Sequence, residues 1–264
     1  MTNPQLERTV IGGVDTHKLT HHAAALDART GQILGDQEFP ATGAGYAQLL
    51  DWLLAFGVLM KVGVEGTGSF GAGLQRHLEQ HQVLVREVSR PNRQDRRARG
   101  KSDPIDAINA ARAVLSDTAT AVPKARAGFV EAVRLIRATR RSAAKARRVA
   151  IQQIHGILYS APDELRDRLA GYDRAALVSR CAKLRLTPGA AIDDSAATAH
   201  RMLRRLARRI RQLDEEIAEA DQELRIILAE RTPHLLAATG VGTEAAGQLI
   251  TTAGENIDRL RSEA

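Results

Sequence analysis

Val10-Ile11-Gly12-Gly13-Val14-Asp15 is an apolar run that ends in an acid. A run of this kind is typical of a buried strand, and it places Asp15 where the strand ends. A second run, Val62-Gly63-Val64-Glu65, repeats the pattern and ends in Glu65. We therefore expect the folded chain to bring these two acids toward one point.

A third stretch, Lys101-Ser102-Asp103-Pro104-Ile105-Asp106-Ala107, has the features of a helix start. Proline suits the first helical position, and Asp103 and Asp106, three residues apart, share one face. The same pair would also serve as an N-cap and the third residue of a capping box. A single acid at the end of a strand is likewise an ordinary turn residue. The joint pattern of acids predicts a site more strongly than any one of them.

Clustered carboxylates favour a bound cation, because their mutual repulsion otherwise raises their pKa values and protonates some of them. Hard ions such as Mg²⁺ prefer oxygen ligands of this kind. Two such ions can activate a nucleophile and stabilise the leaving oxygen of a phosphate. We predict that the four acids are catalytic residues and bind Mg²⁺ or Mn²⁺: Asp15, Glu65, Asp103 and Asp106.

The order of elements around these acids indicates the fold class. Residues 9–15, 21–27 and 32–39 are predicted strands, followed by a helix over Tyr46 to Leu54 and the strand that ends at Glu65. A helix with Phe70, Leu74 and Leu78, the strand Val83-Leu84-Val85 and the acid-bearing helix complete the unit. This order is that of an RNase H-like fold, an α/β domain with a mixed sheet covered by helices. We assign it to residues 1–122.

From about Pro123 the strand patterns cease, and residues 123–232 are predicted to be a helical coiled-coil region. Apolar residues alternate spacings of three and four from Leu203 to Ile227, as in a coiled-coil seam. The partner could be an earlier helix, Phe129 to Leu158, in an antiparallel hairpin. It could equally be a second copy of the chain in a homo-oligomer, and the sequence does not choose between the two.

Residues 233–264 predict the beginning of a small helical domain. Ala238-Thr239-Gly240-Val241-Gly242-Thr243-Glu244-Ala245-Ala246 resembles the turn of a helix-hairpin-helix. There Gly240 and Gly242 would permit a tight turn and expose backbone N–H groups to a phosphate. A packing turn between two helices is the alternative. The stretch from Asp258 to Ala264 has no glycine cap and no proline, so we expect a truncated domain.

The composition favours a polyanionic partner. Lys and Arg total 38 against 31 Asp and Glu, which gives a net charge of +7 and a pI near 10.0. Aromatic residues are only 3% of the chain, which argues against base stacking as the main means of binding. The single Cys181 excludes an internal disulfide and a cysteine-cluster metal site, and we expect it to be buried. The sequence contains neither a signal peptide nor an uninterrupted apolar span, so we expect a cytoplasmic, nucleoid-associated protein without membrane spans.

Basic residues are concentrated in blocks. One block directly precedes the acidic pair, a second follows Ala132 without an intervening acid, and a third extends from Arg201 to Arg211. Charge runs on helices are often only solvated faces, but three blocks, of which only the first has opposing acids, Glu87 and Asp95, favour nucleic-acid binding. The predicted contacts from the first two blocks are Arg93, Arg96, Arg97, Arg99, Lys101, Arg137, Arg140, Arg141, Lys145, Arg147 and Arg148.

Two other patterns are weaker. Gly66-Thr67-Gly68-Ser69-Phe70-Gly71 lacks the ending of a nucleotide-binding P-loop and predicts a turn into a helix. His17, His21 and His22 could suggest zinc. Alternation along a strand would place the last two on opposite faces, so we do not predict a zinc site.

With these motifs, the chain resembles the DEDD transposases of insertion sequences, the IS one-ten group, across essentially its whole length. Gly13-Val14-Asp15-Thr16-His17-Lys18 is similar to the family's first-acid motif, and Val64-Glu65-Gly66-Thr67-Gly68 to the second. The stretch Lys101 to Ala107 is similar to the third and fourth.

The resemblance implies a RuvC-like N-terminal domain, similar to Holliday-junction resolvases, a coiled-coil arm and a C-terminal transposase domain. It also implies a structured, guide-like RNA partner. In the family a C-terminal serine cooperates with the carboxylates in DNA strand exchange. Its motif lies beyond Ala264, so no serine here is assigned that role.

The leading hypothesis is a metal-dependent, RNA-directed DNA transposase or recombinase that acts on the ends of a mobile element and on target DNA. One alternative is a Holliday-junction-type nuclease, which needs the same acids but no RNA. Another is a catalytically inactive nucleic-acid-binding regulator.

Overall fold

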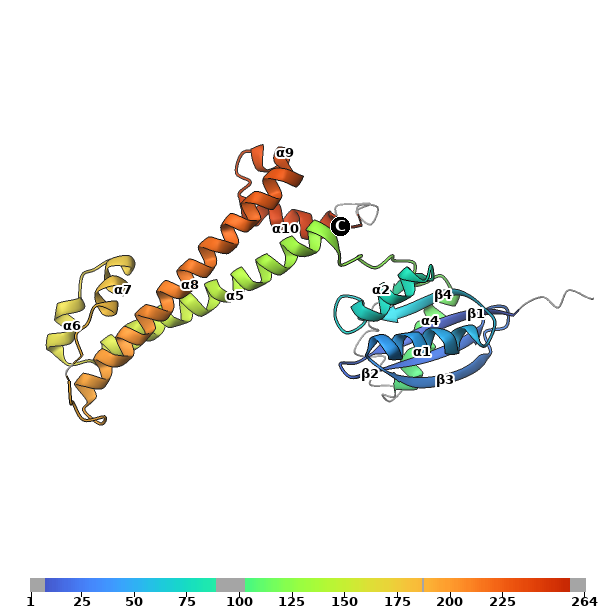
Figure 1. Ribbon diagram of the computed structural model, residues 1–264, viewed down its shortest axis with the longest axis horizontal. Helices are drawn as coiled ribbons and strands as arrows, with labels where there is room; N and C mark the ends of the chain where they lie inside the picture. Colours follow the sequence, from blue (N-terminus) through green and yellow to red (C-terminus); the bar gives the residue numbers. More distant parts are fainter. Residues whose placement is uncertain (1–7, 89–102, 187, 257–264) are drawn as a thin grey trace, which may run out of the picture. The chain divides into compact units, whose positions relative to one another are not determined.

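The computed structural model describes residues 8–88, 103–186 and 188–256 of the chain. It contains two compact units, one formed by residues 1–126 and 255–264 and the other by residues 127–254. The first holds the sheet and the second is a helical arm (Figure 1).

The first unit is built on a five-stranded sheet in the order β3-β2-β1-β4-β5. Its strands are β1 (Thr9–Thr16), β2 (Thr20–Asp27), β3 (Ile33–Pro40), β4 (Val58–Glu65) and β5 (Leu84–Val88). The first three form an antiparallel meander, whereas β4 is parallel to β1 and β5 to β4. The sheet is therefore mixed, and helices flank it. The predicted fold class is confirmed.

Strand alternation divides the core of this unit between the two faces of the sheet. Val10, Val14, Val62 and Val64 belong to the core on the face covered by α1 (Gly43–Leu54) and α2 (Ala72–Gln80). Ile11 belongs to the core on the opposite face, beneath α4 (Asp103–Leu115). The predicted turn over residues 66–71 is confirmed, since it leads directly into α2.

Two glycines let α4 lie directly on the strands. A Cβ atom added to Gly13 would lie 2.2 Å from the backbone N of Ala111 and 2.3 Å from the backbone O of Ala107. One added to Gly63 would lie 2.7 Å from the backbone O of Ala110. A side chain at either position would push the helix away, because such distances are far below van der Waals contact. The glycines thus fix the height of α4 above β1 and β4.

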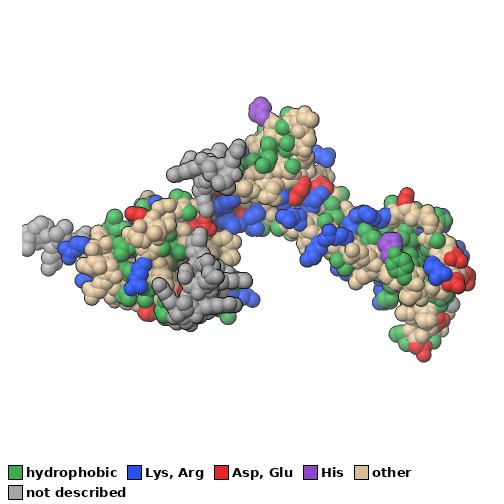
Figure 2. Space-filling model, turned by 180° about the vertical axis from the view of Figure 1, so that it is seen from behind, with side chains coloured by type: hydrophobic (Ala, Val, Ile, Leu, Met, Phe, Trp, Pro, Cys, Tyr) green, Lys and Arg blue, Asp and Glu red, His purple; other side chains and the backbone are tan. Residues whose placement is uncertain are grey.

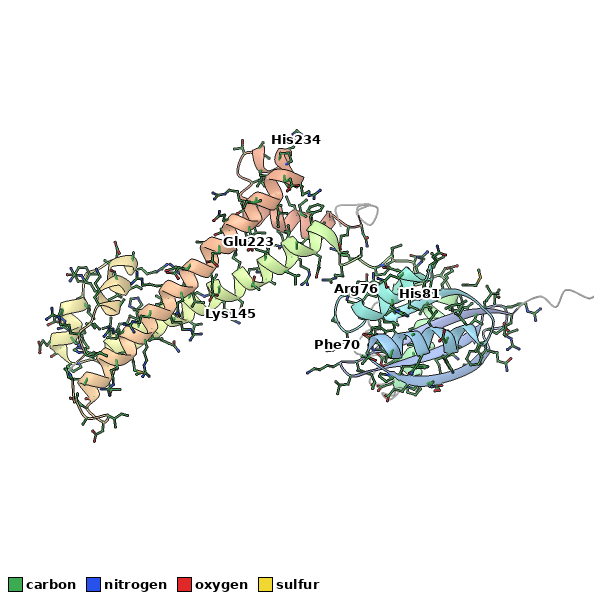
Figure 3. All side chains as sticks on the ribbon, viewed as in Figure 1. Phe70, Arg76, His81, Lys145, Glu223 and His234 are labelled. Atoms are coloured by element: carbon green, nitrogen blue, oxygen red, sulfur yellow. The ribbon has the colours of Figure 1, made fainter. Side chains whose placement is uncertain are left out.

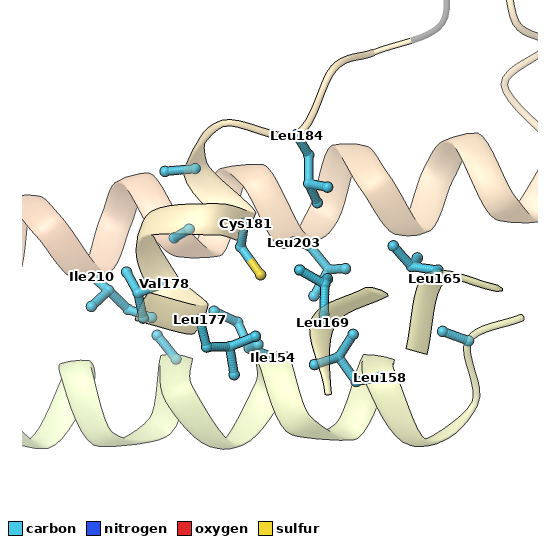
Figure 4. Packing of buried hydrophobic residues seen from close by; sticks show 14 residues of the cluster. Ile154, Leu158, Leu165, Leu169, Leu177, Val178, Cys181, Leu184, Leu203 and Ile210 are labelled. Carbon is cyan, nitrogen blue, oxygen red and sulfur yellow. The ribbon is translucent and has the colours of Figure 1, made fainter. Parts of the chain in front are cut away.

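The helical arm consists of two long helices joined by two short ones. The long helices are α5 (Gly128–Tyr159) and α8 (Ser195–Arg231), with α6 (Asp163–Leu169) and α7 (Arg174–Ala182) between them. Two short helices, α9 (Pro233–Ala237) and α10 (Thr243–Ala253), follow α8. A core at the tip of the arm joins α5, α6, α7 and α8 (Figure 4).

Ion pairs set the antiparallel register of α5 and α8. Arg140 pairs with Asp221 at 2.6 Å, and seven residues later Arg147 pairs with Asp214, seven residues earlier on α8. Leu203, Ile210 and Leu224 of the predicted seam are buried in the cores of the arm. Within the chain, α5 and α8 therefore pair as an internal antiparallel hairpin.

Candidate metal centre

The register of β1 and β4 brings two acids to one edge of the sheet. Val14 is the parallel partner of Val64, so Asp15 and Glu65 follow at neighbouring strand ends. Both acids are buried. The hydroxyl of Thr16 donates a hydrogen bond of 2.7 Å to the backbone oxygen of Glu65 and ties the two ends together.

Helix α4 adds an acid to this edge. It contacts Gly13 through Ala107 and Ala111, so its first turn reaches beyond Gly13 toward Asp15. There Asp103 meets His17, which follows β1. The Nε2 atom of His17 lies 3.1 Å from Oδ2 of Asp15 and 3.3 Å from Oδ1 of Asp103.

These side chains present a set of converging ligand atoms. One atom each from Asp15, His17 and Asp103 lies within 4.8 Å of the other two. Oδ2 of Asp15 and Nε2 of His17 are buried without a hydrogen-bond partner. Buried polar atoms left in this way are costly, and a bound cation would satisfy them. Two carboxylates and an imidazole fit a divalent metal such as Mn²⁺ or Mg²⁺.

The other two predicted acids lie on the elements that form this centre. Glu65 ends β4, and Asp106 is in the first turn of α4, three residues after Asp103. Among the described residues, the tight ligand group contains Asp15 and Asp103 but neither Glu65 nor Asp106.

His17 is the member of this group that the sequence analysis did not assign. The available signal was its spacing, because side chains two residues apart along an extended chain point the same way, as Asp15 and His17 do. His21 and His22 do lie on opposite faces. His21 is fully buried and stacks on Tyr46, whereas His22 hydrogen-bonds Asp36 at 3.2 Å.

The predicted nucleic-acid contacts fall into three groups. Arg93, Arg96, Arg97, Arg99 and Lys101 lie outside the described residues. In the second basic block, Arg137, Arg140 and Arg147 pair with acids of the arm. Arg141, Lys145 and Arg148 are exposed, and in the described part of the arm no carboxylate pairs with them.

Arg137 is deeply buried, and its guanidinium donates hydrogen bonds to side chains of α10. Its guanidinium donates to Glu244 at 2.8 Å, to Gln248 at 2.7 Å and to Thr251 at 2.9 Å. By contrast, Arg141, Lys145 and Arg148 follow helical spacing along one face of α5. Figure 3 shows Lys145 on that helix, and Figure 2 shows several groups of Lys and Arg side chains on the arm. These three residues keep their charges available to a partner.

The two predicted hairpin glycines lie in the exposed turn between α9 and α10. Gly240 has a φ of 81°, in the left-handed region that favours glycine. Gly242 is the N-cap of α10, with φ −82°. A Cβ atom at either position would meet nothing within 4 Å. Both backbones are therefore open to solvent.

No helix in the described ranges is long and apolar enough to cross a membrane.

Comparisons with known proteins identify the family. A search of curated proteins found no match. Residues 12–161 match the family model of the DEDD transposases of the IS110 group, described as "Transposase". The match covers more than half of the chain, including the end of β1, all of β4 and α4, and the residues of the candidate metal centre. The chain therefore belongs to the DEDD transposase family of insertion sequences, whose members are DNA-processing enzymes.

Proposed function

We propose that this transposase is a metal-dependent DNA recombinase guided by a structured RNA, with its metal centre at Asp15, His17 and Asp103. The observation that supports it best is the convergence of three ligand atoms within 4.8 Å, two of them buried without a hydrogen-bond partner. Without a metal, these two atoms contact each other at 3.1 Å but make no hydrogen bond, and burying polar atoms in this way lowers stability.

The protein's part in the chemistry follows from how these ligands are held. Strand β1 fixes Asp15, and the close contact of α4 with Gly13 fixes Asp103. A divalent ion in this centre would activate a nucleophile and stabilise the leaving oxygen of a phosphodiester. Glu65 ends β4 next to the end of β1, and Asp106 follows Asp103 by three residues on α4. We therefore assign both as further catalytic acids.

Direct titration tests the metal centre. Mn²⁺ is titrated calorimetrically into the purified chain and into Asp15→Asn, His17→Ala and Asp103→Asn variants whose folding is checked by circular dichroism. We expect saturable binding that weakens by tenfold or more in each variant. Asp117→Asn is the matched control, since Asp117 is an exposed acid of the same unit that pairs with Lys61 at 2.8 Å. Unchanged binding in all three variants would contradict the proposal.

The ligand set also predicts a preference between metals. An imidazole nitrogen is a softer ligand than Mg²⁺ usually accepts, whereas Mn²⁺ binds mixed nitrogen and oxygen sites more readily. We therefore propose tighter binding of Mn²⁺ than of Mg²⁺, with a smaller difference in His17→Ala. Equal preference in the parent chain and the variant would exclude His17 from the centre.

RNA guidance rests on the family resemblance and on the free cations of α5. Exposed Arg141, Lys145 and Arg148 offer a phosphate backbone three charges on one helix face. Cleavage assays with branched and linear DNA, each with and without a structured, guide-like RNA, separate the enzyme classes. Cutting of branched DNA without RNA would favour a junction nuclease. Nucleic-acid binding without any cleavage, unaffected by neutralising the acids, would favour a regulator.

A further inference from the structure

The tip of the arm contains a pocket of about 350 Å³ outside the stretch that matches the family model. Basic side chains from three helices and the segment after α7 converge on it. Arg168 comes from α6, Arg180 from α7 and His200 from α8. Lys183 and Arg185 follow α7, and buried Leu169 and Leu184 complete the lining.

Among the described residues, no acid lines this pocket. Within the same ranges no carboxylate forms an ion pair with its arginines or its lysine. Like charges brought together by separate elements repel one another, and an exposed helix face does not require such convergence. The apolar floor strengthens the field of the cations above it, because its polarisability is low. The arrangement therefore favours a bound anion.

Two of the cations are held in place before any ligand arrives. The guanidinium of Arg180 lies 3.9 Å from the ring centre of Tyr172, a cation–π contact. Arg168 Nη2 lies 3.2 Å from Nε2 of His200. Since arginine can only donate, His200 accepts this bond and is neutral in this arrangement. Preorganised donors lose less side-chain entropy when they bind a ligand.

The electrostatics of His200 agree with this geometry. Burial lowers the pKa of His200, and the charge of Arg168 lowers it further, while Glu164 and Asp194 act more weakly in the opposite direction. The imidazole thus remains an acceptor that orients Arg168, and the permanent positive charges are those of the arginines and the lysine.

We propose that this pocket binds phosphate groups of a nucleic-acid backbone, with Arg168, Arg180 and Lys183 as the principal contacts. Arginine forks match phosphate oxygens in pairs, and a lysine adds a point charge. The preference for an anion follows from the pocket itself. The choice of a nucleic acid as its source rests on the proposed function.

The first test uses inorganic phosphate as the probe. The ring signals of His200 and the guanidinium signals of Arg168 and Arg180 are followed by NMR during a phosphate titration of the full chain. We expect saturable shifts confined to the pocket, which disappear in the Arg168→Gln/Arg180→Gln double variant. Absence of shifts in the parent chain would overturn the pocket as an anion site.

The second test uses fluorescent oligonucleotides as single-stranded RNA, hairpin RNA and duplex DNA. In the double variant we expect tenfold or greater weakening of at least one of them. The salt slope should fall by about 1 for each phosphate that the variant no longer neutralises. Arg225→Gln is the control, because Arg225 is an exposed arginine of α8 outside the pocket. The oligonucleotide whose binding weakens identifies the nucleic acid.

The outcomes separate this inference from the proposed function. Unchanged affinity and salt slope for every oligonucleotide, despite phosphate binding, would overturn the nucleic-acid assignment and indicate a small phosphorylated ligand. Mn²⁺ binding by the parent chain and the double variant, measured in parallel, tests the metal centre independently. Circular dichroism of both arginine variants verifies that the arm is folded.

Discussion

Cys181 belongs to α7 and lies in the core at the tip of the arm (Figure 4). The burial of Cys181 that the sequence predicts is confirmed. Burial raises the pKa of its thiol to about 11, so almost none of it is thiolate near neutral pH. We expect a thiol reagent such as Ellman's reagent to label the native chain at least a hundredfold more slowly than the urea-unfolded chain. Rapid labelling of the native protein would contradict the packing of the tip.

His21 couples the stability of the sheet unit to pH. Its Nδ1 lies 2.9 Å from the backbone oxygen of Thr20, so Nδ1 carries the proton of the neutral ring, and its buried Nε2 has no partner. Protonation would place an unsatisfied charge in the core, and burial accordingly lowers its pKa from the usual 6.5. The unfolded chain therefore binds more protons, and stability falls as pH drops below about 6.5.

The variant His21→Phe tests this coupling, since phenylalanine keeps the stack on Tyr46. Thermal unfolding is measured at about pH 5 and about pH 7.5. We expect the loss of Tm on acidification to be smaller in the variant, although half-buried His77, whose pKa desolvation also lowers, maintains part of it. His155→Phe, at an exposed position, should leave the loss unchanged. An unaltered pH dependence in His21→Phe would contradict the prediction.

The contact between α4 and the sheet leaves no room for a side chain at Gly13. Gly13→Ala would bring a Cβ to 2.2 Å from backbone, so α4 must move, at a cost of about 3 kcal/mol. Gly12→Ala meets only side-chain atoms of Leu53 and Val62 at 3.1 Å, and we expect a loss of about 1 kcal/mol. Urea unfolding compares the two. Equal stabilities would show that α4 does not rest on Gly13.

The pairing of α5 with α8 is tested by exchanging charges. Arg140→Asp should destabilise the arm by about 1 kcal/mol, because it replaces a partly buried ion pair with two acids. The double variant Arg140→Asp/Asp221→Arg should recover most of that loss in urea unfolding. Arg141→Asp is the matched control, since Arg141 is exposed and has no acid partner in the described arm. Failure of the exchange to restore stability would contradict the register.

The sequence predicts a feature well when the feature has a local sequence pattern and poorly when it depends on a tertiary contact. Apolar runs and alternation were sufficient for the strands through Glu65, because each strand carries its own pattern. Which cations of the second basic block form ion pairs and which remain exposed was not predictable from the sequence. Arg140 and Arg141 are adjacent and chemically identical, and only the register of α8 makes one an ion-pair partner and leaves the other exposed. The role of His17 likewise depends on where α4 places Asp103, which is a tertiary contact.

In the whole molecule, the sheet unit and the arm have separate cores. Units with their own cores unfold as separate transitions unless an interface couples them. We expect calorimetry to resolve two transitions and Mn²⁺ to raise only that of the sheet unit, by about 2.7 kcal/mol at a hundred times its Kd. A single transition, or an equal shift of both, would contradict this prediction. Asp15→Asn, with binding weakened tenfold or more, should reduce the metal-dependent shift to about 1.4 kcal/mol or less and keep both transitions.

The two ion pairs between α5 and α8 affect which parts of the arm can change independently of each other. Arg140 and Arg147 fix the register of α5 against α8 outside the segment from Ser160 to Asp194. That segment joins the two helices and packs against them in the core at the tip. An insertion or deletion in its loops need not change the register of α5 against α8. Apart from His200, the described residues that line the basic pocket all belong to that segment. Substitutions on the surface of that segment can therefore alter the pocket and leave the ion pairs between α5 and α8 in place.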